Sequence, residues 1–152
     1  MSATAGRLHY THWRAAVSVL HAIWFEARVA DASLQTWFRE HRQMGGRDRA
    51  QLSGLVYGVL RDAQSVARLA GSDADAERLL MVYALRHAIV DRDSLLRFAP
   101  AVLIDAERSI AAHADALSLA DTHNVPAPVW SRWLTQYGEH ESLALAQALN
   151  VE

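Results

Sequence analysis

The sequence has 152 residues, the size of one ordinary domain, of which 51% are hydrophobic and 21% are charged. A disordered chain would be poorer in apolar residues and higher in net charge, so disorder is excluded as a global description. All 15 basic residues are Arg, and Cys is absent. The lack of Cys excludes disulfides, Cys-ligated zinc, iron–sulfur clusters and thiol nucleophiles from this chain.

The expected location is the cytoplasm, without contact with a membrane. The N-terminal segment, residues 1–14, lacks the apolar region of a signal peptide. The longest uncharged runs, 15–25 and 50–60, have eleven residues each. A membrane-spanning helix needs about 20 apolar residues, so both runs are interpreted as buried helix faces.

The formal net charge of −2 is unevenly distributed along the chain. Residues 1–70 contain nine Arg and five acidic residues, which gives +4, whereas residues 71–152 contain six Arg and twelve acidic residues, which gives −6. Such asymmetry favours a basic face in the first half. The alternative is chance segregation of solvated charges.

Helical periodicity runs through the whole chain, because Gly and Pro are few and no stretch alternates apolar and polar residues as a strand would. The first helix is predicted over 12–29, with Thr11 as its N-cap. The second follows a cap at Asp31 or Ser33 and ends near Gln43, ahead of two consecutive glycines.

Asp48 is expected to cap a long third helix that continues to Gly71, and this segment has the clearest amphipathic pattern in the sequence. Its apolar residues recur at i, i+3, i+4, i+7 and i+8, namely Leu52, Leu55, Val56, Val59 and Leu60. Gly54 and Gly58 lie on one face of the same helix. Because a Gly inside a helix costs about 1 kcal/mol relative to Ala, the pair indicates that another helix packs closely there.

Three further helices are predicted in the middle of the chain, over 72–89, 91–98 and 100–113. The first has acidic residues in its opening turn, which suit the positive end of the helix dipole. The last begins with Pro100, since Pro is tolerated in a first turn.

The C-terminal part is predicted to be a helical pair behind a linker. The segment 121–128 contains two of the three Pro residues and is the best internal linker. The pair follows over 129–137 and 139–149 and is broken at Gly138.

Sequence motifs for catalysis or cofactor binding are absent. The eight His residues include no HExxH pattern, and His9 and His12, three apart, flank a helix start, so no metal site is expected. The chain has no GxSxG, GxxxxGK[ST] or GxGxxG motif either. We therefore expect no catalytic residue and no cofactor in this chain, although a Ser–His–Asp site stays open because its members need only meet in space.

The positive signal is the segment 38–49, FREHRQMGGRDR, which has four Arg against two acidic residues. Arg39 and Arg42 share a helix face, and Arg47 and Arg49 flank the start of the next helix. Guanidinium groups match phosphate oxygens, and a helix N-terminus adds its own amides, so the four are predicted to form a phosphate-binding patch. The alternative is that Arg47 and Arg49 pair with Glu40, with Asp48 or with a helix C-terminus.

Three segments resemble one protein family. The segment 46–61, GRDRAQLSGLVYGVLR, resembles the third-helix signature of the N-terminal domain of Sun/Nop-type RNA (cytosine-5) methyltransferases, which is similar in fold to the antitermination factor NusB. Residues 14–20, RAAVSVL, resemble the family's first helix. Residues 125–150 are similar to the segment that leads into the methyltransferase proper. The middle, 72–124, departs from the pattern because it lacks the family's later helix with an Asn-Gly-Val-Leu-Arg ending.

This resemblance implies an all-α, NusB-like bundle of about six to eight helices, with the C-terminal helical pair behind the Pro-containing linker. It implies an RNA-binding domain over 1–124 and, over 125–152, a helical linker to a methyltransferase domain that this chain lacks. The chain would then be an excised N-terminal domain. S-adenosylmethionine and two catalytic cysteines would belong to the parent enzyme and not to this chain.

The expected function is that of a non-catalytic accessory domain that binds and positions RNA for an rRNA or tRNA cytosine-5 methyltransferase. Its partners would be that RNA and the missing catalytic domain. The residues expected to contact RNA are Arg14, carried over from the first-helix resemblance, and Arg39, Arg42, Arg47 and Arg49. The alternative is a helical protein-interaction or intramolecular docking module that does not bind RNA, which the acidic second half favours. A helix-turn-helix DNA binder is disfavoured because no short turn precedes a polar recognition helix.

Overall fold

The computed structural model describes residues 8–149, and this part of the chain consists of nine α-helices and one 3-10 turn, with no strand. The predicted all-α class is therefore confirmed. In chain order the elements are α1 (Tyr10–Phe25), α2 (Ala30–Glu40), α3 (Gly46–Arg61), α4 (Ala63–Ala70), α5 (Ala76–His87), α6 (Arg92–Phe98), α7 (Pro100–His113), the 3-10 turn η1 (Ala114–Ala116), α8 (Leu119–Thr122) and α9 (Ala127–Leu149). None of these helices is both long and apolar enough to span a bilayer.

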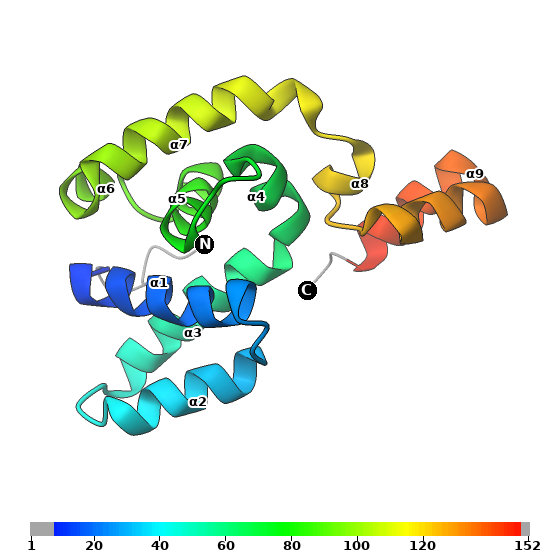
Figure 1. Cartoon of the computed structure of the whole chain (residues 1–152). Coiled ribbons are helices and arrows are strands. Elements are labelled where there is room, and N and C mark those ends of the chain that lie inside the picture. The colour runs from blue at the N-terminus through cyan, green and yellow to red at the C-terminus, as the bar shows by residue number, and fades with distance from the viewer. Residues whose placement is uncertain (1–7, 150–152) are drawn as a thin grey trace.

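The first seven helices form the body of the molecule around one apolar core. Helix α1 packs on α3 and α5, α2 lies against α1 and α3 on one side, and α7 covers α4 and α5 on the other (Figure 1). The predicted apolar face of α3 lies in this core, with Leu60 half-buried and the other four residues buried. Burying such a side chain contributes about 1.5–3 kcal/mol, so this face fixes α3 at the centre of the body. The largest fully buried apolar side chains are Trp13, Leu20, Leu52, Leu80, Met81, Leu95 and Leu103.

The prediction of one long helix from Asp48 to Gly71 is wrong, because the chain breaks at Asp62 into α3 and α4. The buried Asp62 carboxylate forms an ion pair with Arg86 (Nε–Oδ2 2.9 Å) and accepts hydrogen bonds from His87 Nε2 (2.8 Å) and Asn124 Nδ2 (2.8 Å). Three partners on other elements hold this carboxylate at the break. The apolar periodicity continues across the break, so the sequence carries no local sign of it.

Several predicted helix starts are also wrong. The N-caps of α1, α2 and α3 are His9, Val29 and Gly45, where Thr11, Asp31 or Ser33, and Asp48 were expected. Helix α5 begins behind a capping Asp75 instead of at Ser72 or Asp73, where its start was expected. In the case of Asp48 a tertiary contact is the physical reason: its carboxylate lies in the first turn of α3 and bonds His12 of α1.

The expectation of close packing at two glycines of α3 is half correct. At Gly58 the phenol of Tyr83 from α5 occupies the space that a Cβ would fill. At Gly54 no atom lies within 4 Å of a Cβ position. Only Gly58 is therefore required by packing.

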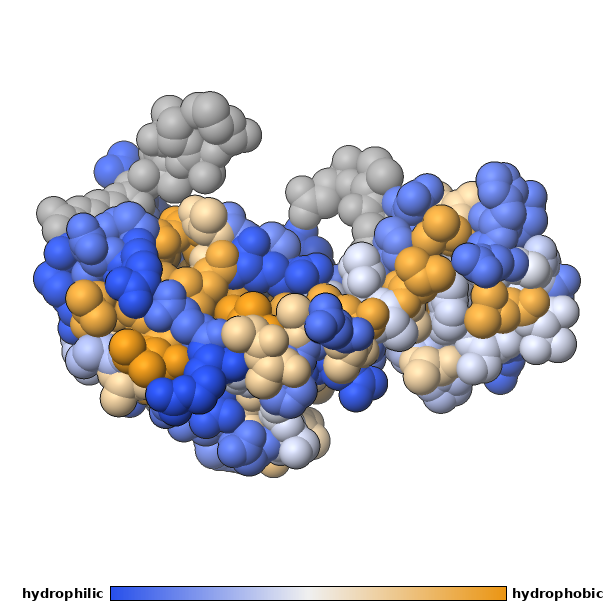
Figure 2. All heavy atoms as spheres, turned by 90° about the horizontal axis from the view of Figure 1, so that it is seen from above, coloured by the Kyte–Doolittle hydropathy of each residue, from blue (hydrophilic) through white to orange (hydrophobic). Residues whose placement is uncertain are grey.

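Helices α8 and α9 form a smaller C-terminal lobe, residues 119–149, beside the body (Figures 1 and 2). The lobe has its own buried apolar cluster of Ala120, Val125, Trp130 and Ala146. The predicted break at Gly138 is confirmed by its positive φ of 82°. Part of the predicted linker is helical, because α8 includes its first residues. The apolar cluster of the lobe contains residues from both sides of position 125. The proposed domain boundary at 124/125 stays a prediction, and Asn150, the last residue of the resemblance, lies outside the described residues.

Candidate nucleic-acid interface

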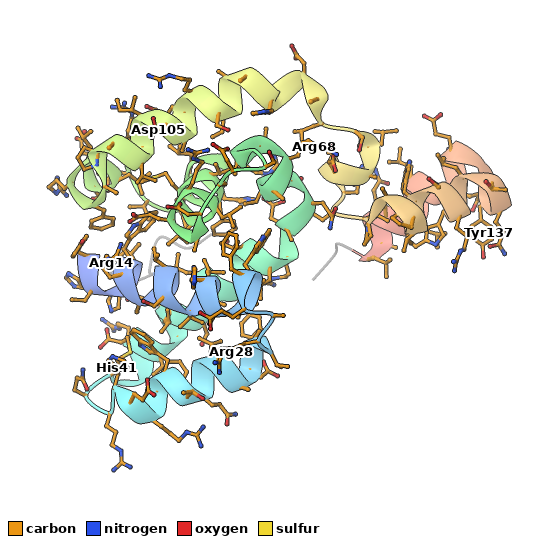
Figure 3. All side chains as sticks on the ribbon, in the orientation of Figure 1. Arg14, Arg28, His41, Arg68, Asp105 and Tyr137 are labelled. Atoms are coloured by element: carbon orange, nitrogen blue, oxygen red, sulfur yellow. The ribbon has the colours of Figure 1, made fainter. Side chains whose placement is uncertain are left out.

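A short turn connects α2 to α3, and the four predicted phosphate-binding residues lie in this turn or in the adjoining ends of the two helices. We call Arg39, Arg42, Arg47 and Arg49 the arginine corner. The turn is held by local contacts: the His41 backbone N–H donates to Trp37 O at 2.9 Å, and the His41 ring stacks on the Trp37 ring at 3.9 Å between centroids. Figure 3 shows His41 at this end of α2. These contacts hold the C-terminal end of α2, and in the turn that follows the Met44 backbone N–H donates to His41 O at 3.1 Å.

A hollow of about 490 Å³ lies beside the corner. Three of its five lining residues, Gln35, Phe38 and Arg39, are spaced i, i+3, i+4 on α2 and so share one flank of that helix, and Arg42 lies in the turn just beyond its C-terminal end. Arg49 of α3 completes the lining. Its Nε donates to Met44 O at 3.0 Å, and its guanidinium lies 5.1 Å from the centre of the Phe38 ring. The structure thus brings three of the four predicted residues to one hollow.

Within residues 8–149 no guanidinium group of the arginine corner forms an ion pair. Arg39 donates to the Thr36 hydroxyl at 3.3 Å and Arg49 to a backbone carbonyl. Arg97 of α6 and Arg132 of α9 also form no ion pair in this part of the chain, although the charge of Arg97 helps to lower the pKa of Asp91. Most other described arginines are paired: Arg14 with Glu77, Arg28 with Glu26, Arg68 with Asp121, Arg78 with Asp73, Arg86 with Asp62, Arg92 with Glu107 and Arg108 with Asp105.

The carboxylate nearest in sequence to Arg47 and Arg49 is used elsewhere. Asp48 Oδ1 lies 2.8 Å from Nε2 of the buried His12, whose Nδ1 accepts the His9 backbone N–H at 3.1 Å. Since Nδ1 is an acceptor, the Nε2 proton points at Asp48. The hydrogen bond from His12 holds the pKa of Asp48 below its usual value, against a smaller opposing effect of burial. The negative charge of Asp48 is therefore directed to α1, and its pairing with either Arg, the alternative from the sequence, is not observed.

The N-terminus of α3 lies beside these charges, and the Asp48 carboxylate in its first turn interacts with the Gly45 backbone N–H, which helps to lower the pKa of Asp48. The N-cap of α3 is Gly45, which supplies no side-chain hydrogen bond, and a Cβ at Gly45 or Gly46 would meet no atom within 4 Å. The first backbone N–H groups of a helix carry partial positive charge and lack partners within the helix. They add to the positive potential next to Arg47 and Arg49 and suit a phosphate group.

Arg14 does not join the corner. Its Nη1 lies 3.3 Å from Glu77 Oε2, and the same carboxylate oxygen accepts the Trp13 indole N–H at 2.8 Å. Arg14 also borders a separate hollow together with Asp75 and Glu77. Figure 3 shows it near the start of α1, away from His41. The geometry gives Arg14 a structural partner, and its role toward RNA stays a prediction from the resemblance.

Sequence reasoning missed the contribution of Gln35 and Phe38. Phe38 stood inside the basic segment, but its place under the guanidinium of Arg49 follows from the α2–α3 turn. The i, i+3, i+4 spacing of Gln35, Phe38 and Arg39 was the signal that could have identified this flank. The helix expected to reach Gln43 ends at Glu40, so Arg42 does not share a helix face with Arg39.

The described residues contain no arrangement suited to metal binding or to a catalytic triad around Ser109. No group of three His, Asp or Glu side chains within 8–149 could hold a metal ion. Ser109 Oγ lies 3.3 Å from His113 Nδ1, but it donates to Leu69 O at 2.6 Å, and no carboxylate in this part of the chain contacts His113. Ser109 therefore ties α7 to α4, and His113 bonds within α7.

No family model matches the sequence, and neither the curated proteins nor the solved structures contain a significant match to it. The likeness to the NusB-like domain of RNA methyltransferases thus rests on the three sequence segments alone.

Proposed function

We propose that this chain binds RNA through the arginine corner. The observation that carries the proposal is that four arginines lie around the α2–α3 turn, that three of them line one hollow, and that none of the four has a carboxylate partner within residues 8–149. An unpaired Arg in a solvated position is available to a phosphate oxygen, and a row of them suits a polyphosphate chain. RNA is chosen among polyanions because residues 46–61, which include Arg47 and Arg49, resemble the RNA methyltransferase domain.

The wider role we propose is that of an accessory domain that positions RNA for a cytosine-5 methyltransferase. The support is the resemblance of residues 14–20, 46–61 and 125–150 in the order expected for that family. S-adenosylmethionine and the catalytic cysteines would belong to a further domain of the same enzyme. This chain would contribute affinity and orientation and no chemistry.

The charge distribution supports oriented binding. The net charge of −2 gives no attraction over the whole surface, so the positive potential is local to the corner. The acidic second half repels phosphate within about one Debye length, roughly 8–10 Å at physiological salt. An RNA strand would therefore approach the α2–α3 side of the body.

The test is a titration of a labelled, unstructured RNA against wild-type protein and the double variant Arg42→Glu/Arg47→Glu. These two side chains form no hydrogen bond or ion pair within the described residues, so their reversal leaves the fold intact. Four phosphate contacts predict a log–log salt slope of about −3, and loss of two reduces its magnitude by about 1.4, at about 0.7 per phosphate. Arg108→Glu on α7 is the matched control. Equal binding by the double variant and wild type would refute the proposal.

A second function, protein docking, is favoured by apolar side chains exposed on the C-terminal lobe. They are Leu119 of α8 and Val129, Leu134, Tyr137, Leu145 and Leu149 of α9, and Figure 2 shows apolar side chains on the surface of this lobe. Under this function the lobe would bind the surface of another protein, and the titration of RNA against the wild-type chain would show no binding.

A further inference from the structure

The hollow beside the arginine corner contains more than positive charge. A surface that binds only phosphate needs neither an aromatic ring nor a carboxamide, yet Phe38 and Gln35 line the same hollow as Arg39, Arg42 and Arg49. Its volume of about 490 Å³ falls in the range of small-molecule pockets, about 300–1,000 Å³. The hollow is thus large enough for one flat ring system with polar edges.

The Phe38–Arg49 pair supplies a flat surface. The guanidinium carbon of Arg49 lies 5.1 Å from the centre of the Phe38 ring, a cation–π arrangement. The bond from Arg49 Nε to Met44 O, 3.0 Å, fixes one edge of the guanidinium plane. Aromatic rings and guanidinium planes are the surfaces on which proteins stack unpaired nucleobases.

Polar groups surround this flat surface on the α2 side. Gln35 lies one helical turn before Phe38 on the same flank, and its carboxamide offers both donors and an acceptor, as the edge of a nucleobase requires. Arg39 follows Phe38 on this flank, Arg42 lies in the turn just beyond α2, and neither has a carboxylate partner within residues 8–149. The hollow therefore presents an amide, an aromatic ring and cations in this order along the chain.

We propose that the hollow takes one unstacked nucleobase of a single-stranded RNA segment. The base stacks on the Phe38–Arg49 pair, its edge bonds Gln35, and the adjoining phosphates contact Arg39 and Arg42. This rests on the proposed RNA binding and adds the form of RNA that is recognised. A duplex is excluded from the hollow because its bases are stacked and paired, so it presents only phosphates to the corner.

The experiment compares three probes: a short unstructured RNA, the same sequence as a blunt duplex, and inorganic polyphosphate, which has charge but no bases. The test variant is Phe38→Leu, which keeps an apolar side chain under Arg49 and removes the stacking ring. Phe25→Leu on α1 controls for loss of an exposed aromatic ring. Because Phe38 is half-buried against the apolar core, thermal unfolding of Phe38→Leu separates lost stacking from lost packing. A second variant, Arg49→Lys, keeps the charge and removes the flat guanidinium. Arg42→Glu reports on the charge alone.

The single strand is expected to bind more tightly than the duplex. Phe38→Leu should weaken its binding by about 5- to 150-fold, the usual effect of losing one stacked base, with the salt slope and polyphosphate binding unchanged. Arg49→Lys should likewise remove the preference for the single strand, whereas Phe25→Leu should behave as wild type. Arg42→Glu should weaken the binding of all three probes.

Two results would overturn the inference, and they are distinguishable. If Arg42→Glu weakens every probe while Phe38→Leu changes none and the duplex binds as well as the single strand, the corner binds phosphate only and RNA binding stands. If neither Arg42→Glu nor Phe38→Leu affects any probe, RNA binding through this corner fails and the inference fails with it.

Discussion

Asn124 attaches the C-terminal lobe to the body, and its replacement by Ala provides a quantitative test of the structure. Its Nδ2 donates to Asp62 Oδ1 at 2.8 Å and its Oδ1 accepts the Ser65 backbone N–H at 3.1 Å. The residue has a φ of 58°, in the left-handed region that Asn tolerates better than Ala. Asn124→Ala therefore removes both hydrogen bonds and adds backbone strain.

The expected loss of stability is about 4 kcal/mol. The Ser65 N–H, on a residue that is 0% exposed, is left without its partner, which costs about 1–3 kcal/mol. Asp62 loses one of three partners but keeps Arg86 and His87, so the loss of the Asn124–Asp62 hydrogen bond costs only about 1 kcal/mol more. The left-handed backbone costs Ala a further 1–2 kcal/mol, roughly. The total free energy of unfolding of a typical domain is about 5–15 kcal/mol, so a loss of this size is a large fraction of it.

The assay is urea denaturation followed by Trp fluorescence, together with amide hydrogen exchange over 119–149. Asn124→Gly is the matched variant: it loses the same hydrogen bonds without the left-handed strain and should be about 1 kcal/mol more stable than Asn124→Ala. Exchange in α8 and α9 should accelerate before exchange in α1, α3 and α5. The reasoning is refuted if both variants lose less than about 1 kcal/mol and lobe exchange is unchanged.

Two further predictions concern α3. Gly58→Ala should destabilise the fold by about 1–3 kcal/mol because the new methyl group displaces Tyr83. Gly54→Ala, in open space, should stabilise the fold by about 0.5–1 kcal/mol. Thermal unfolding of both variants tests this contrast, and equal shifts in melting temperature would contradict it. Asp48→Asn should destabilise the chain at pH 7, since the lowered pKa of Asp48 reflects stabilisation of its charged form by His12. That stabilisation is present above the pKa of Asp48 in the unfolded chain and is lost as pH falls through its lower pKa in the folded chain. In urea titrations at a series of pH values, the difference in unfolding free energy between wild type and Asp48→Asn should therefore shrink below about pH 3.8. A difference that grows there would contradict the role given to His12.

Much of the local architecture followed from the sequence. The period of apolar residues in 52–60 identified the core face of α3, and Gly138 marked the break in the C-terminal pair, because both signals act between residues a few positions apart. The gathering of Arg at 39–49 was equally visible, since the spacing along one helix flank fixes which side chains are neighbours.

Only the tertiary structure decided which arginines have a carboxylate partner within the protein and which are left without one. His12 lies 36 residues from Asp48 and takes its carboxylate, so Arg47 and Arg49 are left without that partner. Glu77, 63 residues from Arg14, pairs with that Arg and separates it from the corner. The break at Asp62 likewise depends on partners from α5 and from the segment behind α8. Helical period is set by neighbours within one or two turns, whereas ion pairing is set by packing between distant segments. The sequence therefore determined where the arginines are, and the fold decided which of them have partners.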